Sequence, residues 1–121
     1  MALAMNHIST RISTHILDLH RGRPATGVPV QLERESADAA WQLVSSTQTD
    51  ADGRCPQLLN SNELPPGIYR LVFDTASYFA AQKLESLYPR IEIVFRVRPG
   101  ESHYHIPLLL NANGYSTYRG S

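Results

Sequence analysis

Apolar and polar residues alternate along most of the chain. Val28, Val30 and Leu32, for example, are separated by Pro29 and Gln31. A period of two is what a β-strand with one buried face requires, because successive side chains point to opposite sides of the sheet. The pattern predicts strands over residues 12–19, 28–33, 41–47, 69–73, 91–98, 102–110 and from 115 towards the end.

Turn signals separate these segments. Asp52-Gly53 is a strong one, because this pair tolerates positive φ, and Pro65-Pro66-Gly67 is another. Residues 58–64 lie between the two turns without a clear period. We therefore expect residues 58–64 to be irregular.

One segment has helical spacing. Apolar residues from Tyr78 to Tyr88 recur at intervals of three or four, and Pro89 stops the pattern. Thr75 or Ser77 would cap the N-terminal end. The sequence predicts a single helix of about three turns.

Short strands with turns at close intervals are typical of a β-sandwich or barrel. The 121 residues are too few for two ordinary domains, so one core is expected. A content of 42% apolar and 18% charged residues is that of a folded globular protein. The fold class predicted from the residues alone is mainly β, in one domain.

Charge and cysteine content narrow the partners. Eleven basic residues balance eleven acidic ones, so neither nucleic acid nor an anionic membrane surface is expected as a partner. Cys55 is the single cysteine, which excludes an intramolecular disulfide and favours a reducing compartment. Residues 1–11 lack the apolar core of a secretory signal, and no stretch reaches membrane-spanning length. We expect a cytoplasmic protein.

Histidines stand on outward positions of two predicted strands. In residues 102–110 the apolar parity of Tyr104 and Ile106 should face the core, which turns His103 and His105 outward. The same argument places His15 opposite its apolar neighbours on the first strand. Histidine titrates near neutral pH and can take a proton from water, so these three are candidates for acid-base chemistry.

Two other interpretations of these histidines stay open. They could be ordinary polar surface, as we expect of His7 and His20. The His-x-His spacing of His103 and His105, with His15 as a third nitrogen, could also bind zinc. No cysteine or carboxylate ligand stands nearby in the sequence, so metal is the weaker interpretation.

Arg54 and the C-terminus supply further candidates. Arg54 follows a turn, where its guanidinium could bind an oxygen-rich substrate or an anionic transition state, although it could also be a solvated surface arginine. Ser13 and Cys55 have no local nucleophile signature, so covalent catalysis is not expected. The terminal residues 115–121 alternate like a strand, which indicates that the tail is held against the protein.

Several motifs together resemble a known family. They are Ser13-Thr14-His15-Ile16-Leu17-Asp18, Asp52-Gly53-Arg54, His103-Tyr104-His105-Ile106-Pro107-Leu108 and the terminal Tyr118-Arg119-Gly120-Ser121. In order and spacing they resemble the 5-hydroxyisourate hydrolases of the transthyretin-like family, from about residue 12 onward. The terminal tetrapeptide is the most specific motif, because it distinguishes these enzymes from transthyretin itself. The resemblance divides the chain into an N-terminal extension, residues 1–11, and a hydrolase domain, residues 12–121.

The resemblance implies a transthyretin-like sandwich of two four-stranded sheets with one short helix. It also implies a homotetramer, a dimer of dimers, with active sites in a channel between dimers. Such a channel would give Leu17 and Leu109 a reason to lie beside His15 and His105. The implied activity is hydrolytic opening of the six-membered ring of 5-hydroxyisourate, in urate degradation, without a cofactor or metal.

The site residues are carried over from the family's motifs. The resemblance implies catalytic roles for His15, Arg54, His105 and Ser121, and substrate contacts for Tyr118, Arg119, Gly120 and, in a supporting role, His103. Either His15 or His105 would activate water, while Arg54 stabilises the oxyanion. Two other classes compete with this hypothesis: a transthyretin-like carrier that binds an aromatic ligand without reacting, and a purely structural module.

Overall fold

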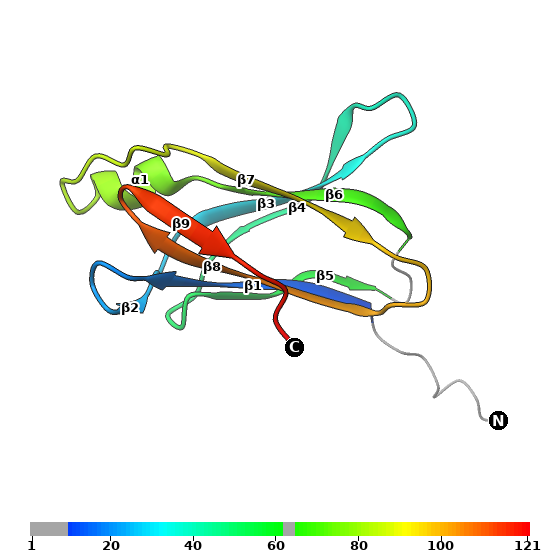
Figure 1. Ribbon diagram of the computed structural model, residues 1–121, viewed down its shortest axis with the longest axis horizontal. Coiled ribbons are helices and arrows are strands. Elements are labelled where there is room, and N and C mark those ends of the chain that lie inside the picture. Colours follow the sequence, from blue (N-terminus) through cyan, green and yellow to red (C-terminus); the bar gives the residue numbers. More distant parts are fainter. Residues whose placement is uncertain (1–9, 62–64) are drawn as a thin grey trace.

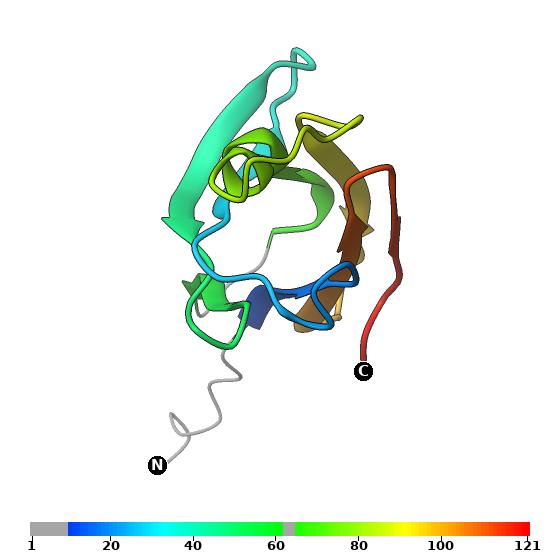
Figure 2. The ribbon, with the colours of Figure 1, turned by 90° about the vertical axis from the view of Figure 1, so that its left-hand side faces the viewer.

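Two β-sheets lie face to face in the computed structural model, which describes residues 10–61 and 65–121 (Figure 1). One sheet has the order β4 (Trp41–Gln48), β3 (Pro29–Glu35), β6 (Gly67–Phe73), β7 (Ile91–Val97), and all its neighbours are antiparallel. Viewed from its end, the molecule shows these strands curving around one side of the core (Figure 2).

The other sheet is mixed. Its central strands, β1 (Thr10–Asp18) and β8 (His103–Asn111), run parallel, and β9 (Gly114–Thr117) pairs antiparallel with β8. The two-residue strand β2 (Arg23–Pro24) and the longer β5 (Arg54–Ser61) both pair with the remaining edge of β1. The sheet is therefore four strands wide, because β2 and β5 share one position. The predicted two-sheet sandwich with one short helix is confirmed.

The core lies between the sheets, where the predicted inward parities meet. Along β1 and β8 every second side chain is buried, and the facing sheet contributes its own alternating set. The large side chains that are fully buried in this core include Ile12, Ile16, Leu108 and Leu110 from the mixed sheet and Val30, Leu32, Tyr69, Leu71 and Phe73 from the antiparallel one. This alternation turns the intervening residues, among them the three histidines, to the other face of the mixed sheet.

The register between β1 and β8 positions those polar groups. Ile12 stands beside Tyr104, Ser13 beside His105, and Ile16 beside Leu108. The Thr14 hydroxyl donates a buried hydrogen bond to the backbone carbonyl of Ile106 across the same pair. A slip by one residue would turn Ile12 and Ile16 out to solvent, so the apolar positions hold the register.

The helix is shorter than predicted. α1 spans Thr75–Ala80, and its cap is Asp74, whose carboxylate accepts the Ser77 N–H at 3.1 Å. The prediction of Thr75 or Ser77 as cap is therefore wrong. Thr75 is buried, and its hydroxyl donates to the Tyr88 carbonyl. Lys83 adopts a left-handed backbone, φ 59°, which ends the helical course well before Pro89.

Two further boundaries differ from the prediction. β5 continues to Ser61, so residues 58–61 are strand where an irregular segment was expected, because they pair with β1. Residues 62–64, like 1–9 with His7, lie outside the described residues. The last strand ends at Thr117. Thr10 and Arg11 belong to β1, and the division of the chain at residue 12 stays a prediction.

The helix is tied to the mixed sheet by one buried polar contact. The Tyr78 hydroxyl donates to a carboxylate oxygen of Asp18 at 2.6 Å, and the other oxygen accepts the Arg21 N–H at 3.0 Å. Asp18 thus joins the end of β1, the following turn and α1. No helix in the described part of the chain is long and apolar enough to cross a membrane.

Candidate active site

Three neighbouring strands present polar side chains on the outer face of the mixed sheet. β1 carries Ser13 and His15, β8 carries His105, and β5 carries Arg54. Backbone pairing sets Ser13 beside His105 and His15 beside Arg54. Residues far apart in sequence are therefore adjacent here, and the predicted outward orientation of His15, His103 and His105 is confirmed, since none of them is in the buried core.

The imidazole of His105 is held from two sides. Its Nδ1 lies 2.8 Å from the Ser13 hydroxyl. A Cβ on Gly120 would stand 2.7 Å from its Cδ2, so the ring packs where only glycine leaves room. Partial burial, the guanidinium of Arg54 and His15 together lower the pKa of His105 from its ordinary value of 6.5. The neutral form of His105 is consequently the major one at pH 7.

Arg54 is placed by a tight turn. Asp50 Oδ1 accepts the N–H groups of Asp52 at 2.9 Å and of Arg54 at 3.0 Å. Gly53 has φ 74°, and a Cβ there would come within 2.5 Å of the Ile16 carbonyl oxygen. The glycine lets the turn approach β1 closely, which delivers the side chain of Arg54 to the outer face of the sheet.

The tail returns to the site in the register of β9. Leu108 pairs with Thr117, and three residues further along each strand His105 pairs with Gly120, whose N–H donates to the His105 carbonyl at 2.7 Å. In this register Pro107 stands opposite Tyr118. Proline has no N–H to donate, so the ladder is interrupted there. The prediction that the tail is held against the protein is confirmed.

The side chain of Arg119 secures the tail. Its guanidinium lies 4.3 Å from the centre of the Tyr104 ring, donates to the His103 carbonyl at 3.0 Å and pairs with Glu101 at 3.3 Å. The Tyr104 hydroxyl donates to Glu101, which lowers the pKa of that carboxyl below its ordinary value. Glu101 is therefore ionised when it meets Arg119.

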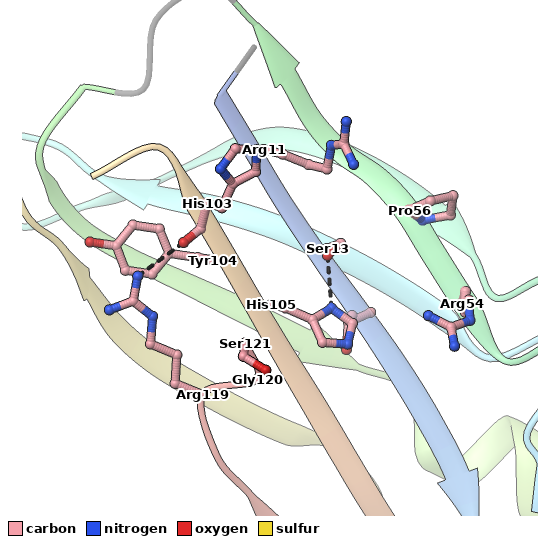
Figure 3. Close-up of a pocket in the computed structure, with 11 residues that line it drawn as sticks. Arg11, Ser13, Arg54, Pro56, His103, Tyr104, His105, Arg119, Gly120 and Ser121 are labelled. Carbon is pink, nitrogen blue, oxygen red and sulfur yellow. Dashed lines mark hydrogen bonds between the residues drawn. The ribbon is translucent and has the colours of Figure 1, made fainter. Parts of the chain in front are cut away.

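These residues border a pocket of about 740 Å³ on the face of the sheet. Figure 3 shows His105 between the tail and Arg54, with Arg11 and His103 near one end. Of the predicted site residues, the pocket is lined by Arg54, His103, His105, Arg119, Gly120 and Ser121. His15 lies beside the site, where it contributes to lowering the pKa of His105, but it is not part of the lining. Tyr118 is also outside the lining and 57% exposed.

The histidines do not gather as a metal site would require. Among residues 10–61 and 65–121, no three His, Cys, Asp or Glu side chains are arranged to hold a metal ion. His103 is exposed, and its Nδ1 lies 3.0 Å from the Ser102 hydroxyl. Burial, with a smaller effect of Asp50, raises the pKa of the Cys55 thiol to about 11, so this cysteine is not a thiolate nucleophile at neutral pH.

What the arrangement offers is a neutral imidazole beside a fixed positive charge. A neutral imidazole can accept a proton from water, and a guanidinium can stabilise an oxygen that becomes negative. The open pocket lies next to both groups. The geometry suits hydrolysis of a small, oxygen-rich molecule.

Comparison with known proteins places this chain in a family. The sequence matches the HIUase/Transthyretin family over residues 12–120. It is 43% identical over 120 residues to a 5-hydroxyisourate hydrolase of Salmonella typhi, covering 99% of this chain and 88% of the relative.

The chain belongs to the HIUase/Transthyretin family.

Two solved structures that resemble this chain carry different names. A 5-hydroxyisourate hydrolase from Klebsiella pneumoniae is 38% identical with a TM-score of 0.80, covering 93% of this chain and 94% of the other. Sea bream transthyretin in complex with thyroxine is 32% identical with a TM-score of 0.85, covering 90% and 93%. The fold is therefore shared by a 5-hydroxyisourate hydrolase and by a transthyretin in complex with thyroxine, so the fold alone does not separate the two functions.

Five lining residues were not predicted as site residues. They are Arg11, Ser13, Thr14, Pro56 and Tyr104, and only Ser13 had been considered, as a nucleophile. The outward parity that identified His15 also includes Ser13 and Arg11. What the sequence lacked was the parallel register, which sets Ser13 beside His105.

The close packing of Gly120 on His105 makes a prediction. Gly120→Ala should displace the imidazole of His105 or lift the tail, because the new methyl would collide with Cδ2. We expect a shift of the His105 ring signals in NMR spectra. We also expect at least about threefold faster hydrogen exchange at the residue 120 amide, the effect of weakening one hydrogen bond.

Gly114→Ala is the matched control for this change. Gly114 also belongs to the C-terminal hairpin, has no positive φ, and a Cβ there would meet nothing within 4 Å. It should leave the His105 signals and the residue 120 amide unchanged. Equal effects of the two substitutions would contradict the packing described for Gly120.

Proposed function

We propose that this protein hydrolyses 5-hydroxyisourate to 2-oxo-4-hydroxy-4-carboxy-5-ureidoimidazoline, a step of urate degradation. The observation that carries the proposal is 43% identity to the Salmonella typhi hydrolase over nearly the whole chain. The pocket supports it, because a neutral histidine and an arginine lie together beside the terminal Tyr118–Ser121 motif. The reaction is a water attack on a cyclic amide, and it needs no cofactor in this scheme.

We assign His105 as the general base. A base must be unprotonated at the working pH, and burial together with Arg54 and His15 lowers the pKa of His105. Its Nε2 takes a proton from water as the oxygen attacks the ring carbonyl. Arg54 stabilises the negative charge that develops on the carbonyl oxygen, and it contributes more in a partly closed pocket than in bulk water.

The remaining residues bind and enclose the substrate. Ser121, with its hydroxyl, and Gly120 lie at the tail side of the pocket. Arg119 holds that tail through Glu101 and Tyr104. His103 contributes to the lining, and we assign supporting substrate contacts to His15 and Tyr118, which lie outside it. Fixing these groups before substrate arrives lowers the entropic cost of reaching the transition state.

A carrier function is the alternative, and sea bream transthyretin in complex with thyroxine is the observation that favours it. Two features favour hydrolysis here. The tail is paired with β8 at Gly120, directly at His105, and the pocket has a cationic, hydrogen-bonding lining. A carrier of an aromatic ligand has no need of a base held neutral.

The ring-opening assay tests the function. 5-Hydroxyisourate is generated in place with urate oxidase, and its ultraviolet decay is followed with and without the protein. We expect decay well above the spontaneous rate. The catalysed part of the rate should fall roughly 100- to 10,000-fold in His105→Ala and about 100- to 1,000-fold in Arg54→Ala. His20→Ala is the control, since His20 is exposed in the turn after β1. Decay at the spontaneous rate, with substrate bound, would show a carrier instead.

A homotetramer, arranged as a dimer of dimers, completes the proposal. The strands β7 and β9 are outer strands of their sheets and lie on the same side of the sandwich (Figure 2). Exposed apolar side chains gather on and near them, among them Tyr88, Val94, Tyr115 and Tyr118. Unpaired edges with exposed apolar groups favour association. A second copy over the outer face of the mixed sheet would also cover Leu17 and Leu109.

Light scattering tests this assembly. Each chain has a mass of 13.5 kDa, and we expect a particle of about four times that mass at micromolar concentration. A stable particle with the mass of one chain would contradict it.

For location, we propose the cytoplasm, because a buried free thiol at Cys55 fits a reducing compartment.

A further inference from the structure

The Ser13 hydroxyl meets the candidate base. Its Oγ lies 2.8 Å from Nδ1 of His105, and both residues are half-buried on the outer face of the mixed sheet. The two are direct partners in the parallel β1–β8 pair. The contact therefore depends on backbone register, and the buried neighbours Ile12 and Thr14 hold that register from the other face.

A neutral imidazole carries one proton, on either Nδ1 or Nε2. A serine hydroxyl can accept from Nδ1–H or donate to a bare Nδ1, so this hydrogen bond alone selects neither form. The surroundings of Nε2 therefore decide which nitrogen carries the proton. Figure 3 shows Nε2 turned to the side where the Arg54 side chain ends. The positive charge of Arg54 favours the lone pair of Nε2 and disfavours an N–H dipole pointing at it.

We propose that Ser13 is a positioning residue that accepts the Nδ1–H of His105 and so keeps Nε2 of that ring unprotonated and facing the pocket. The consequence for catalysis rests on the proposed function, whereas the state of the ring does not. With the proton on Nδ1, Nε2 presents a lone pair to a water molecule in the pocket. With the proton on Nε2, the ring could only donate there, and base catalysis would stop.

The chain contains a matched contact for comparison. Ser102 lies 3.0 Å from Nδ1 of His103, so a second serine meets a second histidine at the start of β8. That pair is exposed, whereas the Ser13–His105 pair is partly buried. Water competes for an exposed hydrogen bond and weakens its hold on the ring. Ser102→Ala is therefore a matched control, because it removes the same hydroxyl group from a contact with His103 instead of His105.

Nitrogen-15 NMR of the substrate-free protein reads the proton position directly. The full chain is labelled at its histidines, the His105 signals are assigned by their loss in His105→Gln, and spectra are taken above the ordinary pKa of histidine. We expect the His105 Nδ1 signal of a protonated nitrogen and the Nε2 signal of an unprotonated one. Ser13→Ala should move both signals towards those of a mixture, and Ser13→Thr, which retains the hydroxyl, should restore them. Ser102→Ala should leave both unchanged.

Turnover supplies the second measurement. Ser13→Ala should lower kcat roughly three- to tenfold, the fold-change that corresponds to one ordinary hydrogen bond, with KM nearly constant because substrate contacts are kept. Ser13→Thr should recover most of kcat. Circular dichroism and the unfolding midpoint establish that each variant is folded, and Ser13→Thr provides a second variant where Ser13→Ala is unstable.

The outcomes separate the two proposals. A native His105 protonated on Nε2, or signals that do not respond to Ser13→Ala, would overturn the role of Ser13 even if the protein hydrolyses 5-hydroxyisourate. If the spectra are as expected but the protein opens no ring, the role of Ser13 in holding the imidazole is supported and the proposed function is contradicted. Loss of kcat that Ser13→Thr does not recover would also count against Ser13.

Discussion

The parallel pairing of β1 with β8 is the constraint on which the rest of the structure depends. On its inner face this pair buries Ile12, Ile16 and Leu108 against the antiparallel sheet. Because side chains alternate along a strand, burying one face commits the other to the residues between. Ser13, His15 and His105 are those residues. The site is the outer side of a pairing that the core requires.

The remaining parts of the site attach to this pair from both sides. On the β5 side, Gly53 allows the turn before Arg54 to approach β1 closely. On the β8 side, the C-terminal hairpin continues in register past Pro107, so that Gly120 pairs with His105. A charge and the tail segment are thus brought to one imidazole by backbone pairing. Arg119 then holds the tail through Tyr104 and Glu101.

Period-two alternation was enough to predict a mainly β sandwich or barrel, the buried parity of β8 and the outward histidines, because burial of one face is a local property of the sequence. The choice of a sandwich came from the family resemblance. The cap at Asp74 and the end of the helix at Ala80 were not predictable from apolar spacing, since the apolar pattern continues to Tyr88 past the left-handed backbone of Lys83. Likewise β5 reaches Ser61 because it pairs with β1, which is a tertiary property.

For the candidate site, the resemblance to 5-hydroxyisourate hydrolases supplied the residue types, and the fold supplied their distances. The sequence could not indicate that Ser13 meets Nδ1 of His105, because 92 residues separate them. It could not distinguish His105 from His15 as base either. That distinction depends on burial and on the neighbouring charge of Arg54, both of which follow from the assembled sheet.

The central claim is that neutral His105, beside Arg54, activates water. Measuring kcat/KM for 5-hydroxyisourate ring opening against pH tests it most directly, because this ratio follows the ionisation of the free enzyme. A base must lose its proton to act, so activity falls as pH drops through its pKa. Since the pKa of His105 is lowered, we predict that the acid limb has its midpoint below 6.5, the ordinary value of histidine. A midpoint above 6.5, or no turnover beyond spontaneous decay at any pH, would contradict the account.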